Sequence, residues 1–208
     1  MKQIDFDHGT VTGNILGVAL PMLVAQILSL LYNIVDRIYI ARIPSVGTTA
    51  LGAVGLCFPI IVIITAFSNL FGSGGAPLFS INRGKGNIKK AEAIMNTSFS
   101  MLCICGVTLM VIGMLFASPI LVLFGASEEG LSYAYPYMMI YLIGTVPSMI
   151  ATGMNPFINA QGYATSGMLS VTIGAVANLI LDPLFIFGLN LGIKGAAIAT
   201  IISQTLSA

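Results

Sequence analysis

Apolar residues occupy most of the chain in long runs, and short polar segments separate these runs. Runs of this length cross a bilayer as helices. The pattern predicts spans at about 15–43, 50–81, 91–116, 133–157, 168–189 and 195–208. The last run stops short of the roughly 20 residues that a span needs, so we expect a truncated sixth helix and a partial chain. The predicted fold class is therefore an all-α membrane protein, a six-transmembrane-helix bundle.

The composition supports a polytopic membrane protein. Hydrophobic residues make up 57% of the 208 residues and charged residues only 7%, too few to cover the surface of a soluble domain. The net charge of +1 gives no indication of a nucleic-acid partner. Residues 1–14 are polar, and we expect them to form a cytoplasmic N-terminal segment that is not a removable signal peptide. The remainder, 15–208, is expected to be one transmembrane lobe in the lipid bilayer.

Charged residues between the runs predict the orientation in the membrane. Segment 83–90 carries Arg83, Lys85, Lys89 and Lys90, the densest positive charge in the chain. Cytoplasmic loops are enriched in Lys and Arg, so this segment is expected inside and the acidic segment 124–130 outside. We therefore expect a multi-pass protein of the plasma membrane, a bacterial inner membrane, with a cytoplasmic N-terminus.

The fifth run contains an acid that is expensive to place in a membrane. A carboxylate near the centre of a span costs about 2.5–3.5 kcal/mol and usually faces a bundle interior or a wet cavity. Asn178 and Asp182 are four residues apart, so they lie on one helix face. Pro183 has no N–H, which leaves the carbonyl of Leu179 without its helical partner. These groups together favour a site for a proton or small cation, although Asn178 serves equally well as a clamp between helices.

A second acid is predicted to lie at the same depth in the membrane as Asp182. Asp36 in the first run and Asp182 in the fifth lie equally far from the expected outer ends of their spans, roughly 10 Å below them. If the two helices pack together, both like charges cannot stay ionised, and the pair accepts a proton or cation. Asn33, three residues from Asp36, is a possible cavity-lining residue. Asp36 could instead lie at the interface or pair with Arg37 or Arg42.

Other residues carry weaker signals. Cys57, Cys103 and Cys105 lie in apolar runs, and the last two point to nearly opposite sides of a helix, so we expect core residues and no metal site. The glycine-rich stretch 72–75 lacks the Lys-Ser/Thr of a phosphate-binding loop and is expected to pack closely against another helix. No catalytic residues and no cofactor are expected.

The sequence resembles the N-terminal lobe of the multidrug and toxic compound extrusion (MATE) transporters, in the branch of bacterial multidrug efflux and DNA-damage-inducible members. The segments that carry the resemblance run through nearly the whole chain: 19–21 (ALP), 33–36 (NIVD), 50–55 (ALGAVG), 80–86 (SINRGKG), 159–162 (NAQG), 178–183 (NLILDP) and 192–200 (GIKGAAIAT). The resemblance implies that Asp36, Asn178 and Asp182 take up protons or sodium. By their neighbourhood, Thr200 and Gln204 are weaker cavity-lining candidates.

The resemblance also implies two six-helix lobes facing each other across a cleft, of which this chain contains one and lacks the C-terminal one. The function expected is export of small organic, cationic compounds by alternating access, with H⁺ or Na⁺ as the coupling ion. The rival on the same fold is a flippase of lipid-linked oligosaccharides, whose anionic substrate favours a basic cavity. An intramembrane aspartyl protease is disfavoured because neither acid follows the Gly-x-Gly pattern of such enzymes, and a purely structural protein explains neither acid.

Overall fold

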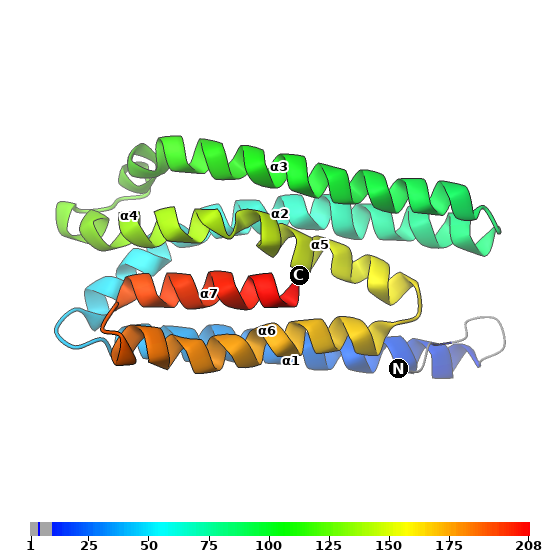
Figure 1. Cartoon of the computed structure of the whole chain (residues 1–208), viewed down its shortest axis with the longest axis horizontal. Coiled ribbons are helices and arrows are strands. Elements are labelled where there is room, and N and C mark those ends of the chain that lie inside the picture. The colour runs from blue at the N-terminus through cyan, green and yellow to red at the C-terminus, as the bar shows by residue number, and fades with distance from the viewer. Residues whose placement is uncertain (1–3, 5–9) are drawn as a thin grey trace.

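The computed structural model describes residue 4 and residues 10–208, and the regular elements of this part are all helical (Figure 1). They are α1 (Val11–Ala41), α2 (Gly47–Gly84), α3 (Ile88–Leu123), α4 (Glu128–Ile143), α5 (Thr145–Ala160), α6 (Ala164–Pro183), the π-helix η1 (Leu184–Gly188) and α7 (Ile193–Ser207). Residues 1–3 and 5–9 of the expected cytoplasmic segment 1–14 lie outside the described residues. Helix α1 begins after Thr10, whose Oγ1 accepts a hydrogen bond from the Gly13 amide at 3.2 Å.

The described helices include four that are long and apolar enough to cross a membrane: α1, α2, α3, and α6 together with η1. Helices α4 and α5 form a further, broken span with a bend of 56° between them. Helix α7 has 15 residues and is shorter than a span. This arrangement agrees with the predicted all-helical membrane bundle whose sixth helix is short.

The fourth predicted span, 133–157, is divided at Gly144. A Cβ at this position would come within 2.7 Å of the Ile201 side chain, so the glycine allows α7 to approach at the break. Pro147 lies in the first turn of α5, where a missing N–H leaves no helical hydrogen bond unmade. A short α5 can therefore begin directly after α4 in a new direction.

The third helix is longer than predicted and continues through Pro119 to Leu123. Ala117 and Leu121 are fully buried on either side of this proline and belong to the main hydrophobic core. Burial of these two side chains holds the last turns in the helical conformation in spite of the lost hydrogen bond.

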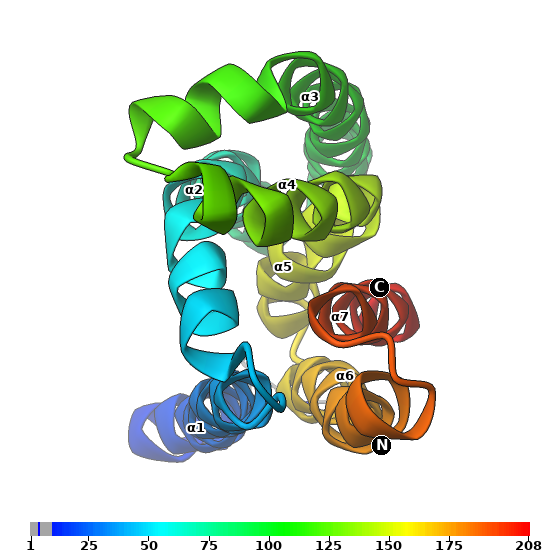
Figure 2. The same ribbon diagram turned by 90° about the vertical axis from the view of Figure 1, so that its left-hand side faces the viewer.

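The helices form a bundle in which segments distant in sequence are neighbours. Helix α1 packs along α6, α2 packs against α3 and α5, and α7 packs against α6 and α4 (Figures 1 and 2). Asn190 and Gly192, with φ of 52° and 55°, form the short turn that returns the chain from η1 into α7. This pairing of α1 with α6 places the two predicted acid-bearing helices side by side.

Small residues set the closest helix contacts. A Cβ on Gly72 of α2 would clash with the backbone of Gly153 on α5, so these helices meet backbone to backbone. This agrees with the close-packing role predicted for the stretch 72–75. Large apolar side chains such as Leu23, Leu115 and Leu123 are exposed on the outside of the bundle, as expected for a surface that faces lipid.

Candidate ion site and cavity

Asp182 and Asn178 form the buried polar centre of α6. Asp182 is fully buried, and Asn178 is 2% exposed. The Nδ2 of Asn178 donates a hydrogen bond to Oδ1 of Asp182 at 3.2 Å, which agrees with the predicted stacking of the two side chains on one helix face. Neither Oδ2 of Asp182 nor Oδ1 of Asn178 has a donor in the described part of the chain.

Asp36 of α1 completes this centre. Its carboxyl group lies within hydrogen-bonding reach of the carboxyl group of Asp182. Oδ1 of Asp36 is buried and has no donor among the described residues. Two carboxyl groups can form a hydrogen bond only when one holds a proton, or they can share a bound cation. The pair is therefore chemically suited to exchange a proton for another positive charge.

The end of α6 changes its helical form directly after the acid. Pro183 is the last residue of α6, and Leu184–Gly188 continues as a π-helix in which the Leu189 amide bonds to the Leu184 carbonyl at 2.9 Å. Such turns are often found at functional sites, where they change the direction of side chains. A Cβ on Gly195 would come within 2.7 Å of the Phe185 backbone, so α7 contacts this turn closely.

Below this pair, five helices line an open cavity of about 310 Å³. Its described lining contains no charged side chain and is rich in hydroxyl and amide groups: Gln26, Ser29, Tyr32, Asn69, Ser148, Thr152, Asn155, Asn159, Asn178, Thr200, Ser203, Gln204 and Ser207. Hydroxyl and amide groups of this kind can bind water inside a protein. Asn178 belongs both to this lining and to the acid pair, so it connects the two.

Of the three residues predicted to line a cavity, two do so in the structure and one does not. Thr200 and Gln204 line the cavity. Asn33 is not among the lining residues: its side chain is exposed, and its Nδ2 donates to the Ser29 carbonyl at 2.7 Å. Three residues on a helix differ by about 60° in direction, which is enough to turn Asn33 away from the face that carries Asp36.

Arg37 lies within electrostatic reach of Asp36, but its guanidinium group packs on an aromatic ring. Its guanidinium carbon lies 5.5 Å from the centre of the Phe58 ring, a cation–π contact on the exposed side of α1. The three cysteines are free thiols, Cys57 buried and the other two half-buried.

Two tyrosines that lie near the acids were not predicted from the sequence as site residues. Tyr137 of α4 is 3% exposed and lies within electrostatic reach of Asp36 and Asp182. Tyr141 lies next to Gln204 and Ser148, which both line the cavity. The two rings stack with centres 6.1 Å apart. Their spacing of four residues in one apolar run places both rings on one helix face and could have been noticed in the sequence. Aromatic pairs at this spacing, however, are more often ordinary core residues than parts of a site.

The described helices thus form a multi-pass bundle with a polar cavity beside a buried carboxyl pair. The MatE family model matches residues 21–184, and the chain belongs to this family.

Curated relatives and solved structures agree with this assignment. The chain is 31% identical to a FAD transporter of Shewanella oneidensis, over 94% of this chain and 44% of the relative. It is 29% identical to the multidrug export protein MepA of Staphylococcus haemolyticus, over 97% of this chain and 44% of that protein. An outward-facing multidrug resistance MATE family transporter of the MOP superfamily superposes with a TM-score of 0.88 at 27% identity, over 96% of this chain and 44% of that one. The chain thus spans less than half the length of the proteins it matches.

Proposed function

We propose that this chain forms one lobe of an ion-coupled antiporter that exports organic cations, with H⁺ or Na⁺ as the coupling ion. The observation that carries the proposal is the buried contact between the Asp36 and Asp182 carboxyl groups, joined through Asn178 to a polar cavity. Acids inside a membrane protein are retained where they serve ion or substrate pathways.

The proposed mechanism is an exchange of charge. A cavity whose carboxyl pair carries net negative charge attracts a positively charged compound. Arrival of a proton or sodium ion from outside neutralises the pair, so the compound is held less tightly and leaves outward. The ion then leaves inward and restores the charge. Each ligand favours a different state of the protein, which is the requirement for coupling through alternating access.

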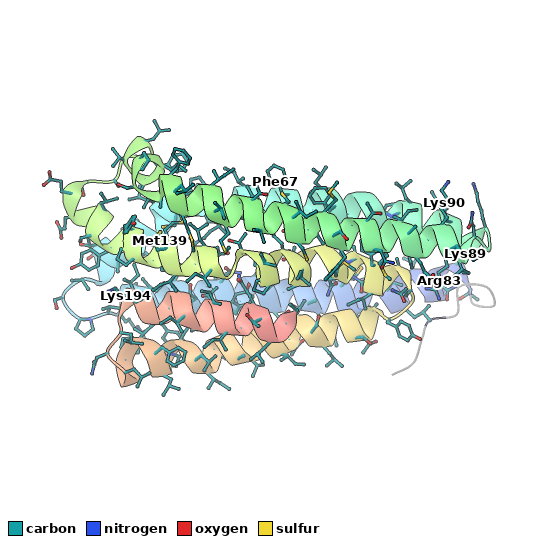
Figure 3. All side chains as sticks on the ribbon, turned by 45° about the horizontal axis from the view of Figure 1, so that its top comes forward. Phe67, Arg83, Lys89, Lys90, Met139 and Lys194 are labelled. Carbon is teal, nitrogen blue, oxygen red and sulfur yellow. The ribbon has the colours of Figure 1, made fainter. Side chains whose placement is uncertain are left out.

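In this proposal the protein lies in the plasma membrane, a bacterial inner membrane, with its N-terminus in the cytoplasm, and a second lobe faces the one described here. Arg83, Lys89 and Lys90 lie at one end of the bundle and Lys194 toward the other (Figure 3). The denser positive end is assigned to the cytoplasm by the positive-inside rule. The relatives' greater length supports the second lobe.

A second candidate is export of a dinucleotide such as FAD, which is favoured by the 31% identity to a FAD transporter. FAD is an anion, and the described lining of the cavity beside the acid pair offers it no positive side chain. The same absence argues against a lipid-linked oligosaccharide, the substrate of the flippase alternative. The cavity therefore favours a cation.

Transport in proteoliposomes of the two-lobe transporter tests the proposal. A fluorescent organic cation and FAD are offered separately, and ΔpH and ΔNa⁺ are imposed one at a time. We expect the cation to move under one of the two gradients, and Asp36→Asn or Asp182→Asn to abolish that movement while the protein still inserts. Gradient-driven export by both variants at the parental rate would contradict the proposed ion site, and movement of FAD alone would contradict the proposed substrate.

A further inference from the structure

Exposed polar side chains form a stripe along α1. Gln26, Asn33 and Arg37 are all exposed. Asn33 and Arg37 follow Gln26 by about two and three helical turns, so the three side chains lie on one face. Ile27 and Ile34 lie about a quarter of a turn away and are exposed and apolar, as expected for a surface that meets lipid. Helix α1 thus carries a polar edge beside its apolar outer face.

Helix α2 carries a matching stripe on the same side of the bundle (Figure 2). Thr65, Asn69 and Ser73 are exposed and follow one another at intervals of four residues, so they lie on one face of α2. Phe58 lies on this face about three turns before Asn69. The guanidinium carbon of Arg37 is 5.5 Å from the centre of the Phe58 ring, so the two stripes meet there. We refer to both stripes together as the polar face.

The cavity beside the acid pair opens onto the polar face. Gln26 of α1 and Asn69 of α2 both line this cavity, and both are exposed at the same time. Two lining residues that reach the surface on neighbouring helices mark the rim of an opening. The mouth of the cavity therefore lies between α1 and α2.

Hydrocarbon is a poor neighbour for this face. Asn33 and Thr65 donate hydrogen bonds to carbonyl groups of their own helices, at 2.7 and 2.9 Å, which makes their exposure tolerable in lipid. Gln26 and Asn69 have no hydrogen-bond partner in the described part of the chain. A side-chain amide without a partner is costly to place in an apolar medium. The polar face consequently requires water or protein in front of it.

We infer that the second lobe lies opposite the polar face and that the cavity mouth opens into the gap between the two lobes. The inference rests on the proposed two-lobe transporter and names the surface that its second lobe faces. The relatives are more than twice as long as the part that this chain matches, which provides a partner of sufficient size. The outer face of α3, where Ile104 and Leu115 are 63% and 72% exposed, is apolar and suits lipid instead. Cargo then reaches the cavity from the gap and not from the bilayer.

Photocrosslinking in the full two-lobe chain tests which surface the second lobe faces. The photoreactive amino acid p-benzoylphenylalanine is placed at position 69 or, as the matched control, at position 70. Leu70 is 60% exposed and neighbours Asn69, but it points about 100° away around the helix. After illumination in native membranes, the crosslinked peptides are identified by mass spectrometry. We expect peptides of the second lobe from position 69 and none from position 70, and the pair of positions 26 and 27 on α1 should repeat this difference.

A thiol reagent tests for water at the same face. The native cysteines are replaced by alanine, and Asn33→Cys is compared with Ile34→Cys, which lies on the apolar side of α1. A membrane-impermeant, positively charged thiosulfonate should modify position 33 about tenfold faster or more, because a thiol in hydrocarbon does not ionise.

Four results would overturn the inference. The first is an absence of second-lobe peptides at positions 69 and 26, and the second is the same set of peptides from positions 70 and 27. The third is a crosslink from position 69 to a second copy of the chain. The fourth is equally slow modification of positions 33 and 34. Each result is independent of ion coupling, which the Asp36→Asn and Asp182→Asn variants test by export.

Discussion

The carboxyl groups of Asp36 and Asp182 meet within hydrogen-bonding reach although the two residues are 146 positions apart in the sequence. The contact exists because α1 packs along α6. One acid belongs to each helix, so a relative movement of the two helices alters the distance between the carboxyl groups. In the proposed function, this geometry would link the charge on the pair to the conformation of the lobe.

Cation binding to this pair should stabilise the folded protein. A ligand that binds only the native state raises the free energy of unfolding, by about 2.7 kcal/mol at one hundred times its dissociation constant. We expect the coupling ion, added as Na⁺ or as acid, to raise the thermal unfolding temperature of the protein in detergent. Asp36→Asn should remove this response. Asn33→Ala, on the same helix but outside the cavity lining, should retain it, and an equal response in Asp36→Asn would exclude the pair as the ion site.

Much of the architecture was predictable because apolar run length and helix geometry are local properties. The runs predicted the spans, and the spacing of Asn178 and Asp182 predicted their contact on one face. The break at Gly144 was not predictable, because glycine and proline are common inside membrane helices. Whether a helix bends there depends on the contact with Ile201 of α7, which the local sequence does not contain.

The site was predictable where it consists of carboxylates, which are energetically costly to place in a membrane span. Asp36 and Asp182 are conspicuous in apolar runs, but their contact depends on which helices pack together. Tyr137 and Tyr141 resemble ordinary packing residues, and only the fold brings them to the acids and to Gln204. Asn33 was grouped with Asp36 by spacing, and the rotation of α1 places it on the exposed side.

Because α2 and α5 are in close contact, replacing Gly72 by alanine should cost much more stability than replacing Gly74. In Gly72→Ala the new Cβ would meet the Gly153 backbone, which cannot move aside without separating the helices. We expect a loss of about 1–3 kcal/mol of stability, measured by unfolding in detergent. Gly74→Ala is the control, because a Cβ there has no neighbour within 4 Å. Equal stability of the two variants would contradict the close contact.

The proposed orientation predicts which loops reach each side of the membrane. Lys89→Cys lies at the start of α3 and Glu129→Cys at the start of α4, and both positions are exposed. A membrane-impermeant maleimide added to intact spheroplasts should label position 129 and not position 89. Permeabilisation should then expose position 89. The reverse pattern would place the N-terminal end outside.

Pro183 should matter more for ion binding than for folding. In Pro183→Ala the restored N–H can bond to the Leu179 carbonyl, so α6 can continue regularly where the π-helix Leu184–Gly188 now follows. This change rotates the turn next to Asp182 and alters its approach to Asp36. We expect equal or greater thermal stability together with a weakened stabilisation by the coupling ion. Pro119→Ala in α3, where the helix already continues regularly through the proline, should keep the full response. A full response in Pro183→Ala as well would show that the π-helix does not position the acid pair.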